Sequence, residues 1–178
     1  MILKTPRLIL RPLSMQDALT LFKISKDKNI QLYTKLGKQN SIKKLKNYLG
    51  NELKLQKQNK AMHFTIISES AKQIIGLISL KNLDQYNKRA SIKYLLDKKF
   101  RNKGYTKEAC KIIIKFAFNK LKLNRIELNC AATNIASKKL INNLDAKYEG
   151  TQRKRIKIKN EFIDRLQYSI LKKEYQPN

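Results

Sequence analysis

The stretch RNKGYTKEA, from Arg101 to Ala109, places one glycine among cations directly before an apolar helical run. The first turn of a helix exposes unpaired backbone N–H groups at the positive end of the helix dipole, where an anion can bind. Gly104 has no Cβ and would let a phosphate approach the backbone, and Arg101, Lys103 and Lys107 add positive charge. These residues are consistent with a pyrophosphate cradle, and also with an ordinary first helical turn flanked by solvated lysines.

Three other loops that bind phosphate or RNA are excluded by residue type. The P-loop pattern G-x-x-x-x-G-K-[ST] and the dinucleotide-binding pattern G-x-G-x-x-G are both absent, because the five glycines are widely scattered. The RNA-binding RNP1 pattern begins at Lys103, Gly104 and Tyr105. It then requires a small residue and an aromatic one, where the chain has Thr106 and Lys107.

The chain is strongly basic along its whole length. Its 178 residues include 40 Lys and Arg against 13 Asp and Glu, a formal net charge of +27. Such a field attracts nucleic acid, ribosomes, anionic lipid or a phosphorylated cofactor. A lysine-biased composition that keeps a small protein soluble would explain the same charge. With 42% hydrophobic residues the chain can bury a core, and its length predicts a single domain over residues 1–178.

Cysteine and histidine usage predicts neither a disulfide nor a metal site. Cys110 and Cys130 lie in predicted regular elements and are expected to be buried free thiols. His63, the only histidine, lies in the strand-like MHFTII and is expected in the core or at an edge, since zinc needs more nitrogen and sulfur ligands. MILKTPRLIL is too short and too interrupted for a signal peptide, and no apolar run approaches a membrane span. We therefore expect a cytoplasmic protein with no membrane association.

Hydrophobic periodicity predicts about seven strands and four helices. Alternation predicts strands over residues 3–13, 61–68, 73–80, 88–96, 124–130, 147–158 and 161–171. Helical spacing predicts helices over 14–25, 41–58, 103–121 and 134–144, with Ser14 and Asp17 as an approximate capping box. The order β-α-α-β-β-β-α-β-α-β-β places a three-stranded meander before a β-α-β unit. It predicts an α/β fold of the α+β kind, with a mixed, mostly antiparallel, twisted sheet.

The loop resembles the acetyl-CoA loop of the GNAT N-acetyltransferases, whose pattern is Arg-x-x-Gly-x-Ala/Gly at a strand-to-helix step. Here Arg101, Gly104 and Thr106 occupy its key positions. The segment TPRLILRPL is similar to the opening strand of the branch that acetylates ribosomal-protein N-termini. The resemblance continues in order through IIGLISL, IKYLLDKKF, NCAATNIASKKLINNL, KYEGTQRK and the late Asp164. Each of these motifs alone is a weak indication of the family, but the ordered set covers nearly the whole chain.

Four departures from the family pattern concern substrate contacts more than fold or cofactor. Thr106 stands where Ala or Gly is usual, so its hydroxyl could add a phosphate contact or its bulk could loosen the cradle. Ser91 stands where relatives often carry an acid on the fourth strand, and it cannot act as a carboxylate base. Lys93 replaces a common glycine, and Asp145-Ala146 stands where Gly-Phe is usual.

The resemblance implies that acetyl passes from the thioester of acetyl-CoA to a primary amine without a metal. A backbone N–H near Leu95 or Leu96 would stabilise the developing oxyanion, and Ser137 would protonate the departing thiolate unless it only orients a loop or the pantetheine. Asn134 would hydrogen-bond the cofactor arm, or serve as a plain N-cap. The residues expected to bind the cofactor are Leu95, Leu96, Arg101, Asn102, Lys103, Gly104, Tyr105, Thr106 and Asn134.

The general base is not evident from the sequence. Glu149, in KYEG, is the best remaining acid, although an ordinary surface position on a strand is the favoured explanation for it. Asp164 lies in a closing strand, where a structural role is the alternative. A water chain to solvent could replace a dedicated base if the acceptor is an N-terminal α-amine, because its pKa is near ~8 against ~10.4 for lysine.

Three functions therefore remain open. The first is an N-acetyltransferase for the N-terminal α-amine of a protein, possible acceptors being ribosomal proteins reached through ribosome or RNA association of the basic surface. The second is an acetyltransferase for a small amine metabolite or antibiotic, although a polycationic acceptor would be repelled by the net charge. The third is a basic nucleic-acid-binding module without catalysis. Either a monomer or a homodimer is compatible with the sequence.

Overall fold

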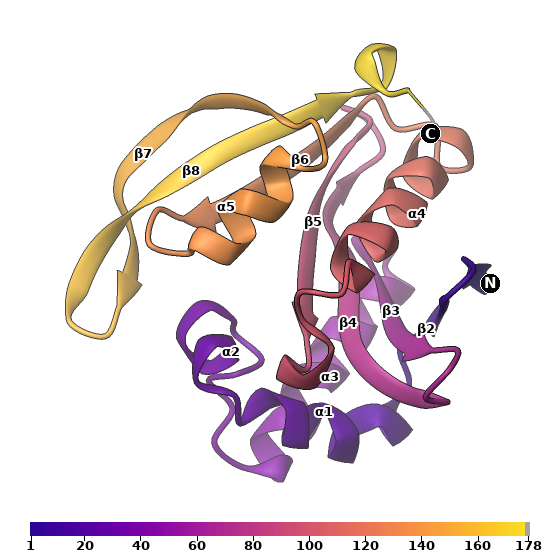
Figure 1. Cartoon of the computed structure of the whole chain (residues 1–178), viewed down its shortest axis with the longest axis vertical. Coiled ribbons are helices and arrows are strands. Elements are labelled where there is room, and N and C mark those ends of the chain that lie inside the picture. Colours follow the sequence, from indigo (N-terminus) through magenta and orange to yellow (C-terminus); the bar gives the residue numbers. More distant parts are fainter. Residues whose placement is uncertain (177–178) are drawn as a thin grey trace.

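The computed structural model describes residues 1–176 and contains one eight-stranded sheet in the order β1-β2-β3-β4-β5-β6-β8-β7 (Figure 1). Its strands are β1 (Leu3–Lys4), β2 (Leu8–Pro12), β3 (Ala61–Ser68), β4 (Gln73–Asp84), β5 (Arg89–Leu96), β6 (Arg125–Ala131), β7 (Lys147–Ile158) and β8 (Glu161–Leu171). The α-helices are α1 (Ala18–Ser25), α2 (Lys28–Tyr33), α3 (Ile42–Lys57), α4 (Tyr105–Asn119) and α5 (Ile135–Asn142). β7 and β8 form a long hairpin that extends away from the other strands (Figure 1).

The sheet is antiparallel except between β5 and β6, which run parallel and are connected through α4. These two strands pair only over Arg89–Ser91 and Arg125–Glu127, and β5 continues to Leu96 paired with β4 alone. Beyond Ser91 the sheet therefore opens between β5 and β6. This opening lies beside the start of α4.

The helices pack on both faces of the sheet. α4 and α5 lie on one face, where Ile113, Phe116 and Ala117 of α4 join the larger apolar core. α1 and α3 lie on the other face and enclose a second core with Leu77 and Leu95. Strand alternation explains the division, because successive residues of β5 point to opposite faces.

Local capping signals set where several elements begin. Ser14 and Asp17 form a complete capping box ahead of α1, and Asp17 also binds Arg11 and Thr65. Ser41 accepts a hydrogen bond from Lys44 N at the start of α3. Because capping uses short-range contacts, the box at Ser14 and Asp17 could be predicted from the sequence, whereas Ser41 was expected only as the first residue of its helix.

The predicted fold class is confirmed, with two additions in detail. The strand expected over residues 3–13 is divided into β1 and β2, with Pro6 in the turn between them. The short helix α2 was not predicted, because its six residues give too little periodicity to recognise. It is capped by Asp27, whose carboxylate accepts from Asn29 N and Ile30 N.

The two cysteines are buried and free, as expected. His63 is 1% exposed on β3, with its Nδ1 2.8 Å from Ser79 Oγ and its Nε2 3.2 Å from Glu52 Oε2. Within residues 1–176, no cluster of three or more His, Cys, Asp or Glu side chains is arranged to hold a metal ion. Over the same residues no helix has the length and apolar character needed to cross a membrane.

Candidate active site

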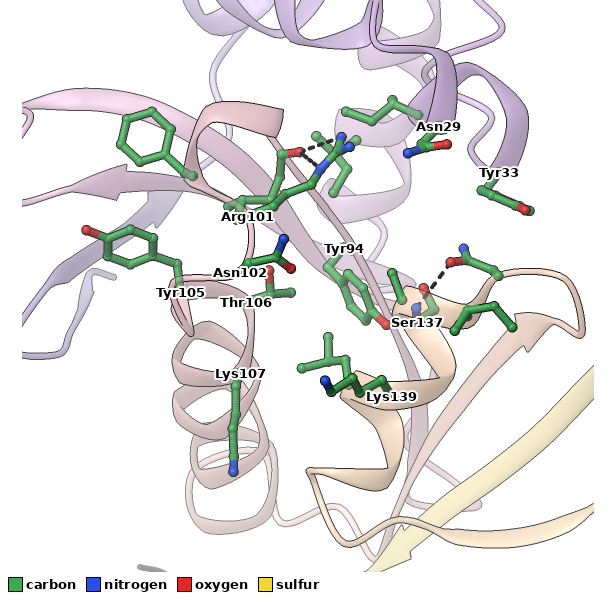
Figure 2. Close-up of a pocket in the computed structure, with 18 of the residues that line it drawn as sticks. Asn29, Tyr33, Tyr94, Arg101, Asn102, Tyr105, Thr106, Lys107, Ser137 and Lys139 are labelled. Carbon is green, nitrogen blue, oxygen red and sulfur yellow. Dashed lines mark hydrogen bonds between the residues drawn. The ribbon is translucent and has the colours of Figure 1, made fainter.

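A cavity of about 650 Å³ lies where the end of β5 meets the starts of α4 and α5. α2 closes it on a further side through Asn29 and Tyr33 (Figure 2). Its lining includes Tyr94, Leu95, Leu96, Phe100, Arg101, Asn102, Gly104, Tyr105, Thr106, Lys107, Thr133, Asn134, Ser137 and Lys139. Two segments that are far apart in sequence, the RNKGYTK loop and the start of α5, therefore share one cavity.

The loop before α4 presents backbone N–H groups rather than a capping side chain. Gly104 is the N-cap at φ 81°, in the left-handed region, and makes no side-chain capping bond. The N–H groups of the first turn therefore have no capping acceptor at the N-cap. A Cβ added at Gly104 would lie 3.3 Å from Arg7 Nη2. A larger residue here is therefore disfavoured both by the left-handed backbone and by the lack of space.

Arg101 fastens this loop to α2 and to β5. Its Nη2 is 2.7 Å from Asp27 Oδ1, and its Nε and Nη2 donate to Leu96 O at 3.2 and 3.1 Å. Burial acts to raise the pKa of Asp27, but Arg101 and the backbone N–H groups of α2 outweigh it and lower that pKa. Arg101, which was predicted to bind the cofactor, thus binds a carboxylate and a carbonyl of the protein. It lines the cavity and joins the loop to α2 and β5.

A second clamp comes from the N-terminal segment. Glu108, in the first turn of α4, accepts from Thr5 Oγ1 at 2.5 Å and from Arg7 Nε at 2.7 Å. Arg7 also donates from Nη1 to Lys103 O at 3.0 Å, and its guanidinium lies 4.7 Å from the centre of the Tyr105 ring. Arg7 thereby neutralises the one acid that would repel an anion at this helix start.

Two hydroxyls line the cavity where β5 faces α5, those of Tyr94 on β5 and Ser137 on α5. Asn134 caps α5 by accepting a hydrogen bond from Ser137 N at 3.1 Å, so its predicted alternative role as an N-cap is present. The phenol of Tyr94 points toward the side chain of Ser137 and lies beside it on the cavity wall (Figure 2). Burial raises the pKa of Tyr94 above its usual range, although the hydrogen bond from Ser137 acts against it. Tyr94 therefore stays protonated and can donate a hydrogen bond at neutral pH.

The backbone of β5 offers a further donor at the opening. Asp97 N donates to Ile75 O at 2.8 Å, on the β4 side. Because N–H groups alternate along an antiparallel strand, the N–H of Leu96 points away from β4 and toward the opening between β5 and β6. Between the two predicted oxyanion donors, this geometry favours Leu96 over Leu95.

Two of the predicted site residues do not line the cavity. The Lys103 ammonium lies 5.8 Å from the Phe100 ring centre, and only the carbonyl of Lys103 takes part in the loop clamp. Glu149 lies on β7 and accepts from Arg125 Nη1 at 2.6 Å and from Ser169 Oγ at 2.7 Å. Arg125 lowers the pKa of Glu149, which is unfavourable for a base. The role of Glu149 as a base stays a prediction.

The other predicted residues are brought together around the cavity: Leu95, Leu96, Arg101, Asn102, Gly104, Tyr105, Thr106, Asn134 and Ser137. Tyr94, Lys139, Asn29 and Tyr33 also line it and were not predicted. Tyr94 lies in the strand predicted over residues 88–96, but no role was predicted for its side chain. Its place at the strand end next to the loop was the available signal. No local signal in the sequence pointed to α2.

A family model described as an acetyltransferase (GNAT) domain matches residues 7–147. The chain belongs to the GNAT acetyltransferase family. This acetyltransferase is 34% identical over 175 residues to the uncharacterized N-acetyltransferase p20 of Bacillus licheniformis, covering 97% of each chain. It is 36% identical over 103 residues to YdaF of Bacillus subtilis, whose name carries a provisional ribosomal N-acetyltransferase assignment, covering 58% and 56% of the two chains.

Solved structures agree on the fold of this acetyltransferase. RimL, named as a ribosomal L7/L12 alpha-N-protein acetyltransferase in complex with coenzyme A, superposes with a TM-score of 0.89 at 17% identity. The match covers 96% of this chain and 98% of that one. At that identity the likeness shows the fold.

Acetyl-CoA is the co-substrate of this acetyltransferase, and the cavity fits it. Anionic phosphates suit the uncapped start of α4 and the approach that Gly104 leaves open. Lys107 and Lys139 line the cavity and form no ion pair with a carboxylate among residues 1–176. Leu95, Leu96 and Phe100 give the remaining wall an apolar character suited to an extended thioester arm.

Proposed function

We propose that this protein transfers acetyl from acetyl-CoA to the N-terminal α-amine of a protein, with a ribosomal protein as the acceptor. The proposal takes residues 1–178 as one catalytic domain acting in the cytoplasm. The observation that carries it is the cavity at the opening between β5 and β6, with donors on both walls. The ribosomal assignments in the names of YdaF and RimL support the choice of acceptor.

Different residues of the cavity would bind the phosphates and stabilise the reacting carbonyl. Gly104 and the first turn of α4 would hold the phosphates, and the clamps by Arg101 and Arg7 hold that turn in place. Bound acetyl-CoA supplies a thioester carbonyl, which an amine attacks. The Leu96 N–H would donate to the oxygen as it gains negative charge.

A proton donor for the departing thiolate is available in two hydroxyls. Ser137 and Tyr94 lie together on the cavity wall, and the raised pKa of Tyr94, caused first by burial, keeps its proton in place at neutral pH. We assign this role to the pair. One hydroxyl would donate while the other orients it.

The net charge supports a protein acceptor over a polycation. A chain of formal net charge +27 repels a free polyamine at long range and attracts an acceptor embedded in RNA. The ordinary pKa of an α-amine, near ~8, also leaves more free amine at neutral pH than a lysine side chain with a pKa near ~10.4.

The test is acetyl transfer to a matched panel, together with calorimetry of acetyl-CoA. The panel pairs each ribosomal-protein N-terminal peptide with the same peptide blocked at its α-amine, and adds spermidine and monoamines. We expect transfer to the free peptides only. Faster transfer to spermidine or a monoamine would instead support the small-amine function. An absence of both binding heat and thermal shift at millimolar acetyl-CoA would contradict the enzyme altogether.

A further inference from the structure

Lys93 occupies the point on β5 where the sheet opens. The last residue of β5 that pairs with β6 is Ser91, opposite Glu127, and Lys93 follows two residues later on the same face of the strand. Tyr94, the next residue, points to the opposite face and lines the cavity. Lys93 and Tyr94 therefore stand on the two sides of one opening.

The amine of Lys93 reaches across this opening. Its Nζ donates a hydrogen bond to Asn129 Oδ1 of β6, two residues beyond Glu127. Nζ forms no ion pair with a carboxylate in the part of the chain that the structure describes. A half-buried lysine held by a neutral amide is unusual, because burial disfavours its charged form unless a carboxylate compensates.

The charges that face Lys93 come from three strands. Lys81 on β4 and Arg165 on β8 are cations, while Glu127 and Cys130 lie on β6. Burial, then Arg165 and then Lys81, lower the pKa of Lys93 to about 8, against the weaker opposing effect of Cys130 and Glu127. Near neutral pH a larger fraction of Lys93 is therefore uncharged than of a lysine with its ordinary pKa. Free lysine amines of this kind serve as general bases.

The carboxylates near this face already form ion pairs with other side chains. Glu127 pairs with Arg125 Nε at 3.1 Å, and Glu52 pairs with Lys81 Nζ at 2.7 Å. Glu149 is held by Arg125 on the far strands. Ser91 stands where the family pattern often has an acid; its hydroxyl donates to Glu127 at 3.3 Å and cannot act as a carboxylate base.

We propose that Lys93, as the free amine, is the general base that takes the proton of the attacking acceptor amine. This inference rests on the proposed function. It adds that the acceptor amine approaches from the face of the sheet opposite the cavity, which is the face on which Lys93 lies. The acceptor nitrogen forms the new C–N bond with the acetyl carbonyl, and the C–S bond of the thioester breaks. One proton passes from that nitrogen to Lys93 Nζ, and the thiolate takes one from the Tyr94 and Ser137 pair. Asn129 positions the lysine.

The first test measures the protonation of the Lys93 amine directly and does not depend on enzyme turnover. Trace labelling with acetic anhydride from pH 6 to pH 11, with mass spectrometry of each lysine, gives the pH at which each amine becomes reactive. We expect a midpoint near pH 8 for Lys93, well below the ~10.4 of a lysine in a model peptide. A midpoint for Lys93 in the ordinary lysine range would overturn the proposal.

The second test compares Lys93→Arg with Lys93→Gln and Lys72→Arg, using an N-terminal peptide acceptor. Arginine keeps the charge but cannot lose its proton, so both Lys93 variants should lose about 10²–10⁴-fold in kcat. Lys72→Arg changes a lysine that is 72% exposed and pairs with Glu69, and it should stay within a few-fold of wild type. Wild-type kcat in Lys93→Arg, or an equal loss in Lys72→Arg, overturns the assignment.

The pH profile separates a base from a structural role. Below pH 7.5, log(kcat/KM) of the wild type should rise with a slope near two, because the acceptor amine, with a pKa near ~8, and Lys93 must both be uncharged. Lys93→Arg should rise with a slope near one. The same slope in both proteins overturns the proposal.

Calorimetry of acetyl-CoA with both proteins then distinguishes the two proposals. A wild-type enzyme that binds acetyl-CoA but acetylates no N-terminal peptide contradicts the proposed acceptor, and the labelling midpoint still decides the state of Lys93. An active wild type with an equally active Lys93→Arg contradicts the base alone.

Discussion

At the scale of single residues, the structure separates cations that hold the protein together from cations available to a ligand. Arg7 and Arg101 each bind a carboxylate, whereas Lys107 and Lys139 line the cavity without one among the described residues. Positive charge in the loop was correctly expected, but its division between clamp and ligand depends on partners distant in sequence. The hydroxyl of Thr106, at the position that departs from the family pattern, lines the cavity.

Gly104→Val should lower acetyl-CoA affinity by at least about tenfold while the protein stays folded, because the branched side chain would fill the approach to the first turn. Calorimetry measures the affinity and circular dichroism the fold. Gly150→Val is the matched control, since Gly150 also has a positive φ, at 141°, but lies on β7 with nothing within 4 Å of an added Cβ. It introduces similar backbone strain away from the cavity. Equal affinity in Gly104→Val and Gly150→Val would remove the cradle assignment.

Ser137→Ala and Tyr94→Phe should each lower kcat more than acetyl-CoA affinity, because a missing hydroxyl affects the departing thiolate more than the bound ground state. We expect about 10–10²-fold in kcat for each, and less than additive losses in the double variant because the two hydroxyls act as one unit. Steady-state kinetics and calorimetry on the same preparations decide it. Matching losses in kcat and affinity would instead indicate a binding role.

At the scale of elements, the start of α4 is held by two ion pairs that join it to other parts of the fold. Arg101 joins the loop to α2, and Glu108 joins the first turn of α4 to the segment before β2. The TPR sequence at residues 5–7 thus contributes two partners of Glu108, Thr5 and Arg7. Both clamps consist of the protein's own side chains, so they restrict the phosphate site without using cofactor contacts, which lowers the ordering cost of binding.

Arg101→Ala and Asp27→Asn should each weaken acetyl-CoA binding, and the double variant should be no worse than the more severe single one. The physical reason is that both changes release the same bond between the loop and α2. A double-mutant cycle by calorimetry should give a coupling energy of about 0.5–3 kcal/mol. Lys99→Ala, an exposed lysine two residues before Arg101, serves as the control. Purely additive losses would show that Arg101 acts on the cofactor itself.

At the scale of the whole molecule, the charge surplus exceeds anything that pairing can neutralise. Thirteen acids face 40 cations, so most lysines remain without a carboxylate in any arrangement. The local cations of the cavity have an assigned use, but those spread over the remaining surface do not. Their combined field favours an acceptor that is part of a polyanion.

Turnover on intact ribosomes should therefore fall steeply with salt, by about tenfold or more in kcat/KM between 50 and 200 mM, while turnover on an isolated uncharged peptide should change little. The pair of measurements separates long-range attraction from salt effects on the active site. An identical salt dependence for the two acceptors would show that the surface charge does not attract the ribosome and reflects only a lysine-biased composition.

The sequence by itself determined the elements, because caps and hydrophobic periods are local. Ser14 with Asp17, the alternation of residues 88–96 and the glycine before α4 predicted the elements now called α1, β5 and α4. The resemblance to GNAT proteins likewise depended on motifs that can be read in order along the chain.

Only the tertiary structure decided what the charged side chains do. Arg101 meets Asp27 across 74 positions of sequence, and Arg7 meets Glu108 across 101. Lys93 was noted only as a departure from a family pattern until its amine was found across the sheet opening, bound to Asn129. The physical reason is that the pKa and availability of a charge are set by burial and by long-range partners, and neither is encoded in its immediate neighbours.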